Sequence, residues 1–175
     1  MVEHVFHPDH YFNTIGWHAP VLRINPGDRV TTTTVDAHGM DPAGVVVTPP
    51  PNPMTGPFFI NGAEPGDALV VRLEKIAPNR RTGWSACRLA TNVVEPGYTG
   101  ELGHPSGDQP RQTAEWLLDL ASWTAELLTP KTRLGAFRLP LAPMLGCFGV
   151  APALGQSIST ATSAEHGGNM DYRGF

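Results

Sequence analysis

The sequence predicts a mainly β fold, a barrel or sandwich with little helix, and composition gives the first two reasons. Glycine (19) and proline (18) supply 37 of the 175 residues, about a fifth of the chain, where about an eighth is typical. Proline interrupts helix interiors and glycine weakens them, whereas both suit the turns between short strands. The hydrophobic fraction of 41% excludes a disordered chain and is sufficient for a buried core.

Short runs rich in β-branched or other apolar residues, separated by turn sequences, give the third reason. Strands are expected at residues 21–24, 29–35, 45–48, 58–60 and 68–76. The sequence Pro-Gly-Asp precedes a strand-like run twice, at 26–28 and 65–67, and the two copies could be equivalent corners of the fold. In the run after the second copy, Leu69, Val71 and Leu73 alternate with side chains that include two charges, so one face of this strand is expected to meet solvent.

Residues 112–128 carry the one helix-like pattern of the chain. The side chains that follow one helical stripe are Trp116, Leu120, Trp123 and Leu127. Two strands that turn at Ala121 and Ser122 would account for the same residues, and periodicity alone leaves both interpretations open.

The remaining segments contain no second core and no linker. Residues 1–20 hold four of the seven histidines and are expected to form a polar arm, with a metal site formed by Asp9, His7 and His10 as the alternative. Residues 77–111 are rich in turn signals, and residues 133–175 again favour strand and turn. The sequence therefore predicts a single domain over residues 1–175.

Charge and cysteine content exclude several classes of protein. The net charge is −4, the sequence pI is about 5.9, and the ten arginines and two lysines are scattered, so nucleic-acid binding is not expected. No basic start with an apolar run resembles a signal peptide and no apolar run is long enough to span a membrane, so a cytoplasmic protein with no membrane partner is predicted. Cys87 and Cys147 are too far apart for a Cys-x-x-Cys motif and are expected to be reduced.

A first candidate site lies in residues 34–41, where Asp36, His38 and Asp41 fall within six residues. In an extended chain Asp36 and His38 lie on the same side and could present an oxygen and a nitrogen to one cation. An aspartate that caps a turn beside a solvated histidine is the alternative interpretation.

A second candidate is Glu64, which lies between Gly62-Ala63 and a Pro-Gly turn. A carboxylate fixed in this way could act as a general base or as a metal ligand. Glu64 and Asp67 could equally be residues that only hydrogen-bond within the turn.

A third candidate lies in residues 165–171, near the last residue of the sequence. His166 is followed by Gly167-Gly168, which permit close backbone approach, and then by Asn169 and Asp171. A histidine, an amide and a carboxylate on a glycine-rich turn predict a metal or substrate site. The segment matches neither Gly-x-Gly-x-x-Gly nor a Gly-Lys-Ser phosphate loop.

The common motifs of serine and cysteine hydrolases find little support in the sequence. No Gly-x-Ser-x-Gly motif occurs, which disfavours a serine hydrolase, and neither Lys75 nor Lys131 has the serine-rich surroundings of a Ser-Ser-Lys amidase. A cysteine-dependent amidase using Cys147 or Cys87 remains a rival, although Cys147 lies in an apolar run typical of inert packing.

Taken together, these motifs resemble the acetamidase/formamidase family. The matching segments, in order, are PGD (26–28), TVDA (34–37), NPMTGPFFINGAEPGDALVV (52–71), PMLGCFGVAP (143–152) and HGGNMD (166–171). They extend over most of residues 20–171, so the resemblance is specific although each segment alone is weak.

The resemblance implies an amidohydrolase that splits short linear amides, such as formamide or acetamide, into carboxylate and ammonia. It also implies a largely β fold of that family's kind, cytoplasmic homo-oligomers, a divalent metal ion with zinc as the expected identity, and paired strands at 116–128. The predicted metal ligands are His166, Asp36 and Asp171. The predicted catalytic residues are Glu64, for proton transfer, and Asp36, and the predicted substrate-binding residues are Asn169 and His38.

Members of this family usually continue beyond HGGNMD into a second half, whereas this sequence ends at Phe175. We therefore expect a chain truncated at its C-terminus, or one whose missing half is supplied by another chain. The alternative to an active amidase is a catalytically incomplete β domain that binds small amides or a partner chain without turnover.

Overall fold

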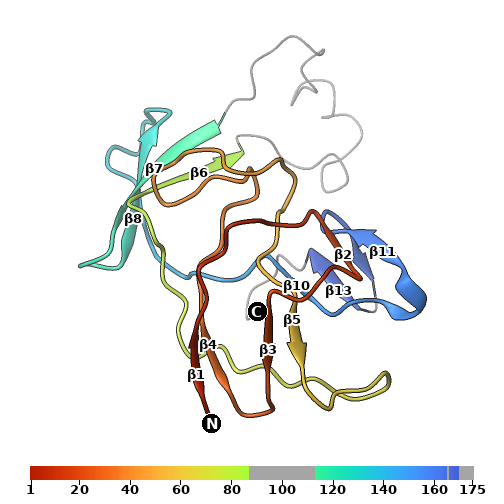
Figure 1. The fold of residues 1–175 in the computed structure, drawn as a ribbon. Coiled ribbons are helices and arrows are strands. Elements are labelled where there is room, and N and C mark those ends of the chain that lie inside the picture. Colours follow the sequence, from red (N-terminus) through yellow and green to blue (C-terminus); the bar gives the residue numbers. More distant parts are fainter. Residues whose placement is uncertain (87–112, 165, 170–175) are drawn as a thin grey trace, which may run out of the picture. The chain divides into compact units, whose positions relative to one another are not determined.

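The computed structural model describes residues 1–86, 113–164 and 166–169, and the chain divides into two compact units. The first unit contains Met1–Asn79 and Pro143–Phe175, and the second contains Arg80–Ala142 (Figure 1). This division into compact units does not test the expectation of a single domain over residues 1–175, which stays a prediction. Cys87 and Asp171 lie outside the described residues.

The fold is mainly β, as predicted, and the only described helix is a short 3₁₀ turn at Ala153–Gly155. The strands of the first unit are β1 (Glu3–Val5), β2 (Thr14–Gly16), β3 (Leu22–Ile24), β4 (Arg29–Thr31), β5 (Phe58–Ile60), β10 (Cys147–Gly149), β11 (Ser157–Ser159), β12 (Ser163–Ala164) and β13 (Gly167–Asn169). The strands of the second unit are β6 (Thr82–Ala86), β7 (Thr113–Asp119), β8 (Thr124–Thr129) and β9 (Arg138–Pro140). In the described part of the chain they form five small sheets and no closed barrel.

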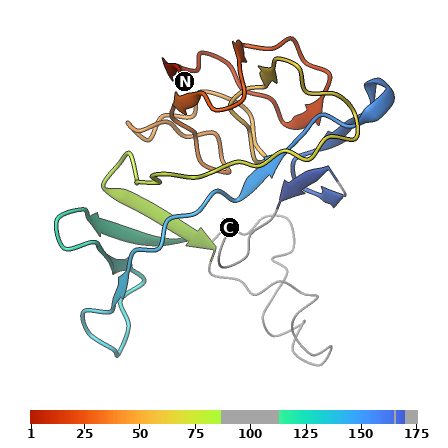
Figure 2. The ribbon, with the colours of Figure 1, turned by 90° about the horizontal axis from the view of Figure 1, so that it is seen from below.

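The first unit contains strands from both the amino-terminal and the carboxy-terminal part of the sequence. Strand β2 pairs antiparallel with β11, and β13 lies between β10 and β12 in an antiparallel sheet (Figure 2). Strands β1 and β4 pair in parallel, as do β3 and β5. Because β1 and β2 both lie in residues 1–20, the expected polar arm is instead part of the sheets.

Two of the expected strands do not form. Residues 45–48 contribute only an isolated bridge between Val46 and Met40, and three prolines follow directly, which prevents further pairing. Residues 68–76 form no strand, although their apolar alternation suits one, because no other described segment pairs with them.

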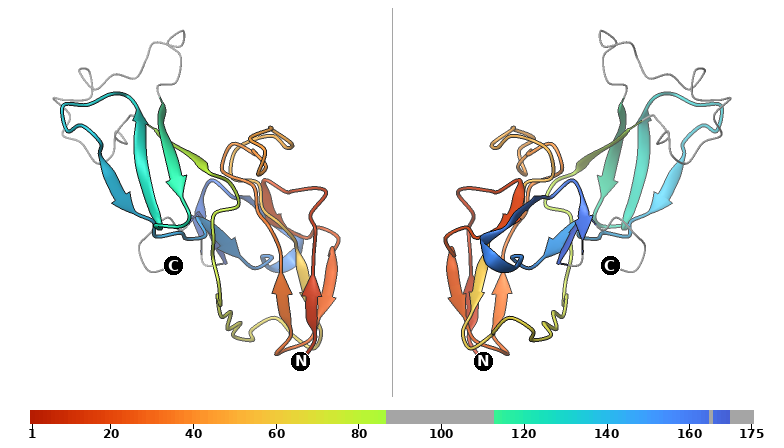
Figure 3. Two further views of the ribbon diagram at one scale, coloured as in Figure 1. Left: turned by 90° about the vertical axis from the view of Figure 1, so that its left-hand side faces the viewer. Right: turned by 90° about the vertical axis from the view of Figure 1, so that its right-hand side faces the viewer.

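The second unit is a four-stranded antiparallel sheet in the order β6-β7-β8-β9 (Figure 3). Residues 113–128 therefore contain paired strands and not a helix, as the family resemblance implied. Asp119 fixes the turn between β7 and β8, because its Oδ1 accepts the N–H of Ala121 at 2.9 Å and its Oδ2 accepts the hydroxyl of Ser122 at 2.7 Å. Trp116 donates its Nε1–H to the hydroxyl of Ser85 across the β6–β7 pair.

Very few described side chains are fully buried. Ile15 (6% exposed) and Thr160 (0%) lie in the first unit, and Ala114 (7%) lies in the second. Among the described residues, no helix has the length and apolar character needed to cross a membrane.

Candidate functional site

The buried hydroxyl of Thr160 is the centre of the polar contacts in the first unit. Its Oγ1 lies 3.0 Å from the carbonyl oxygen of Asn13 and 3.3 Å from that of Pro51, and its N–H donates to the Asn13 carbonyl at 3.0 Å. Its own carbonyl accepts from the Sγ of Cys147 at 3.4 Å and from the Nδ2 of Asn52 at 3.5 Å. Three segments that are far apart in the sequence are therefore fixed around one threonine.

The loop that carries Asp36 is attached to this centre through Asn52. The N–H of Asn52 donates to the carbonyl of Ala37 at 3.0 Å. Within the loop, Oδ1 of Asp36 accepts the N–H groups of His38 at 2.9 Å and Met40 at 3.0 Å. The carboxylate thus closes its own turn, which is the arrangement that the sequence left as the alternative to metal binding, and this contact fixes its orientation.

Residues 41–45 repeat this turn immediately. Oδ1 of Asp41 accepts the N–H groups of Ala43 and Val45, both at 2.9 Å. In each copy the aspartate carbonyl also accepts the N–H of the glycine three residues later, Gly39 or Gly44. These hydrogen bonds show that Asp41 is, like Asp36, part of a structured turn, and the recurring spacing Asp-x-x-Gly was its signal in the sequence.

His166 precedes the glycines of β13, and its carbonyl accepts the N–H of Val150 at 2.9 Å. Its Nε2 is buried and has no hydrogen-bond partner among the described residues. A buried imidazole nitrogen without a partner is costly, so its presence marks a position where a ligand or a proton donor fits.

Gly167 and Gly168 make the close approach that the sequence predicted. Both have a positive φ, 104° and 127° respectively, a conformation that favours glycine. A Cβ at Gly167 would overlap the carbonyl oxygen of Phe148, and a Cβ at Gly168 would overlap that of Thr162. The Gly-Gly pair is therefore required for β13 to lie between its neighbours.

Asn169 is opposite Cys147 in the β10–β13 pair. Its side-chain Oδ1 lies 3.9 Å from the Cys147 Sγ, and that thiol also contacts the Thr160 carbonyl. The Asp36 loop is thus linked to Thr160 through Asn52, and the Asn169 segment is linked to it through Cys147. Sequence reasoning did not identify Thr160 or Asn52; the only signal was a polar Asn52 between two prolines.

Glu64 lies elsewhere in the first unit, on an exposed turn. Its N–H donates to Oδ2 of Asp67 at 2.9 Å, and the N–H of Asp67 donates back to the Glu64 carbonyl at 3.0 Å. No contact of the described residues links Glu64 to the Thr160 centre. The structure therefore joins two of the three predicted segments and leaves the third separate.

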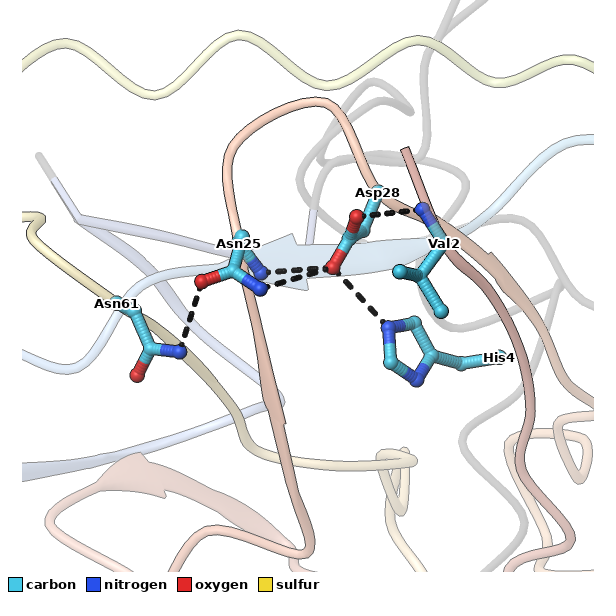
Figure 4. Close-up of polar contacts among 5 residues, drawn as sticks. All are labelled: Val2, His4, Asn25, Asp28 and Asn61. Carbon is cyan, nitrogen blue, oxygen red and sulfur yellow. Dashed lines mark hydrogen bonds and ion pairs between the residues drawn. The ribbon is translucent and has the colours of Figure 1, made fainter.

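The other Pro-Gly-Asp corner, at 25–28, holds a second polar cluster that the sequence did not predict as such (Figure 4). The Asp28 side chain is only 3% exposed and accepts the N–H of Val2 at 2.7 Å, the N–H of Asn25 at 3.0 Å and the Nε2 of His4 at 3.1 Å. These hydrogen bonds, first those from the backbone of Asn25 and Val2 and then that from His4, hold the pKa of Asp28 well below its usual 3.8. The contacts with Val2 and His4 fasten the chain at β1 to the corner, which indicates a structural role.

The described residues fit the predicted metal ion in part. The unpartnered Nε2 of His166 is a suitable donor for a divalent ion such as zinc. Among the described residues, however, no group of three or more histidine, cysteine, aspartate or glutamate side chains is close enough to hold one. The predicted ligand Asp171 is not described, so the predicted set of His166, Asp36 and Asp171 stays a prediction.

Comparison with known proteins identifies one family. The model of the acetamidase/formamidase family matches residues 11–166. No curated protein and no solved structure matches the chain significantly.

Proposed function

Because the chain belongs to the acetamidase/formamidase family over residues 11–166, we propose that it hydrolyses short linear amides such as formamide or acetamide to carboxylate and ammonia. The family match carries this proposal. It is supported by the unpartnered Nε2 of His166, because a hydrolytic site needs a buried group with free capacity to bind.

Amide hydrolysis needs an activated water, a polarised carbonyl and a proton for the departing amine. A divalent ion held by His166, with Asp36 and Asp171 as the further proposed ligands, would supply the first two by lowering the pKa of a bound water and by polarising the carbonyl oxygen. The chain itself must bind the amide, orient it and move the proton.

Among the proposed metal ligands, His166 is the one whose geometry best supports the proposal. Its backbone is fixed by the Val150 N–H and by the two glycines that follow, so the imidazole is held without a hydrogen bond to its Nε2. Replacing His166 with Gln should lower the metal content of the purified protein as well as its turnover. Metal analysis by mass spectrometry provides a readout that is independent of activity.

Asn169 and His38 are proposed to position the substrate. Asn169 lies beside Cys147 on β13, and its amide could hydrogen-bond to the substrate amide. His38 follows Asp36 in the turn attached to Thr160 through Asn52. Asn169→Ala should therefore raise KM more than it lowers kcat.

Glu64 is proposed to transfer the proton to ammonia. Its turn with Asp67 fixes the backbone and leaves the side chain exposed. Glu64→Gln keeps the shape and removes the base, so turnover should fall by roughly 10²- to 10⁴-fold while metal content is unchanged. Glu74→Gln, the same substitution at another exposed glutamate, is the matched control and should retain turnover.

A second candidate function is a β domain that binds small amides or a partner chain without turnover. One observation favours it: among the described residues, no contact links Glu64, the proposed proton-transfer residue, to the Thr160 centre.

The deciding experiment is ammonia release from formamide and acetamide by the purified chain, with and without a chelator. Release that the chelator abolishes supports the metal-dependent amidase. Release that persists in the presence of the chelator contradicts a role of the metal ion in turnover. If thiol alkylation then abolishes the release, a cysteine-dependent reaction is favoured. Absence of release, with amide binding detected by calorimetry, favours the second candidate.

A further inference from the structure

Residues 67–75 form an unpaired and largely apolar stretch at the surface of the first unit. Leu69, Val71 and Leu73 are 45%, 46% and 43% exposed, and Val70 between them is 90% exposed. The difference between Val70 and its neighbours is typical of an extended chain whose alternate side chains point to opposite faces. Figure 3 draws this yellow-green segment without a strand arrow.

The backbone of this stretch has the unused hydrogen-bonding capacity of an edge strand. Among the described residues, none of the N–H or C=O groups from Ala68 to Ile76 makes a backbone hydrogen bond. Its two ends are nevertheless fastened: Asp67 closes the turn with Glu64, and Glu74 forms an ion pair with Arg29 at 2.7 Å. A chain that is held at both ends and has unpaired backbone groups is suited to accept another strand.

The sequence of this stretch is complementary to itself. The side chains on its odd-numbered face are, in order, Asp67, Leu69, Val71, Leu73 and Lys75. If two copies pair antiparallel about Val71, each residue lies opposite the one equally far from Val71 on the other side. Leucine then lies opposite leucine, Val71 opposite its own counterpart, and each Asp67 opposite a Lys75.

The even-numbered face is compatible with the same register. Val70 lies opposite Arg72, and Ala68 lies opposite Glu74, so no like charges face one another. A register centred on Arg72 would instead place two arginines together. The register centred on Val71 places leucine opposite leucine and each Asp67 opposite a Lys75, and this self-complementarity favours a second copy of this chain as the occupant of this edge.

We propose that residues 67–75 pair with the same residues of a second copy, antiparallel and centred on Val71, to form a symmetric dimer. Each residue of one copy then makes the contact that its counterpart makes in the other, as a twofold axis requires. The added strand satisfies the unpaired backbone groups and covers Leu69, Val71 and Leu73.

The first test measures mass by analytical ultracentrifugation over a wide range of concentration. The wild-type chain should shift from the 18.8 kDa monomer toward twice that mass. Val71→Asp places two carboxylates opposite each other and should weaken the dimer by more than about tenfold. Val70→Asp is the matched control: it makes the same change on the opposite face, where the new carboxylate meets Arg72, and should leave the dimer intact.

The second test reads the register directly and does not depend on how Val71→Asp folds. Val71→Cys places two thiols on facing strands, about 4.5–5.5 Å apart at Cβ, and should form a crosslinked dimer on mild oxidation. Leu69→Cys should not crosslink alone, because its counterparts lie about 13 Å apart along the strands, but should crosslink when mixed with Leu73→Cys. The wild-type chain, oxidised in the same way, is the control for crosslinks through the native Cys87 and Cys147.

Three results would overturn the proposal. A wild-type chain that is monomeric at every concentration would leave this edge to a different partner, such as a strand from another protein. A folded Val71→Asp variant, verified by circular dichroism, that dimerises as strongly as the wild type would exclude the edge. Leu69→Cys that crosslinks alone as readily as Val71→Cys would exclude the register.

Discussion

The two Pro-Gly-Asp corners of the first unit have the same turn and different surroundings. In each, the aspartate N–H donates to the carbonyl three residues earlier at 3.0 Å, and the carboxylate accepts the N–H of that earlier residue, at 3.0 Å in the first corner and 2.9 Å in the second. The Asp28 corner is also docked against β1, whereas the residues of the Asp67 corner are exposed. The local sequence thus sets the turn, and a distant segment decides how strongly it is held.

The strands that follow the corners differ in the same way. β4 follows the first corner and pairs with β1. Residues 68–76 follow the second corner and pair with no described segment. An apolar alternating sequence is therefore insufficient for a strand in this fold, because a ladder also needs a partner of matching register.

The largest expected effect comes from removing the docked carboxylate. Asp28→Ala leaves the N–H groups of Val2 and Asn25 and the ring of His4 without their acceptor, whereas Asp67→Ala removes only the bond within the turn. Thermal unfolding should show a clearly larger loss of Tm for Asp28→Ala. Equal losses of Tm at the two corners would contradict the stabilising effect assigned to the contacts of Asp28 with Val2 and His4.

Acid should weaken the first corner. The pKa of Asp28 is lowered in the folded state, so its stabilising contribution is complete above its unfolded value of 3.8 and is lost as the pH falls below it. Urea unfolding followed from pH 6 to about pH 3 should show a decline in stability that is shallower in Asp28→Asn than in the wild type.

The glycines should behave alike at both corners. Gly27 and Gly66 have φ of 87° and 102°, and a Cβ at either would meet no atom within 4 Å. Alanine at each position should therefore lower the free energy of unfolding only by the cost of holding a non-glycine backbone at positive φ, about 1–2 kcal/mol. Denaturant unfolding of the two variants should give similar values; a much larger loss at one corner would reveal a contact beyond the turn.

The smallest effect is expected where the two regions meet, at the exposed pair of Arg29 on β4 and Glu74. Exposed ion pairs contribute little because solvent and salt screen them. Glu74→Gln should leave Tm within a degree or so of the wild type at ordinary salt. A larger loss that disappears at high salt would show that this pair contributes more to the free energy of unfolding than an exposed ion pair usually does.

The sequence predicted the features that depend on neighbouring residues. Both Pro-Gly-Asp corners, the close approach at Gly167 and Gly168, and the mainly β class follow from local chemistry. The paired strands at 116–128 needed the family resemblance, because a stripe of Trp and Leu suits a helix and a hairpin equally.

The site was less predictable because its contacts join distant residues. Asp36, His38 and Asn169 were identified as candidates, but their connection through Asn52 and Thr160 depends on hydrogen bonds across up to 147 residues. No spacing rule relates residues so far apart. Polar side chains between prolines, such as Asn52, carry the only hint that a tertiary contact is made there.

The contact between Thr160 and Asn13 also governs the order in which the chain can fold during synthesis. These residues are 147 positions apart, so at about 5–20 residues per second the ribosome needs about 7–30 s to deliver the second after the first. The second unit, Arg80–Ala142, lies entirely within that interval. We therefore expect its hairpin to form on the nascent chain while β2, at the amino-terminal end, still lacks its partner β11.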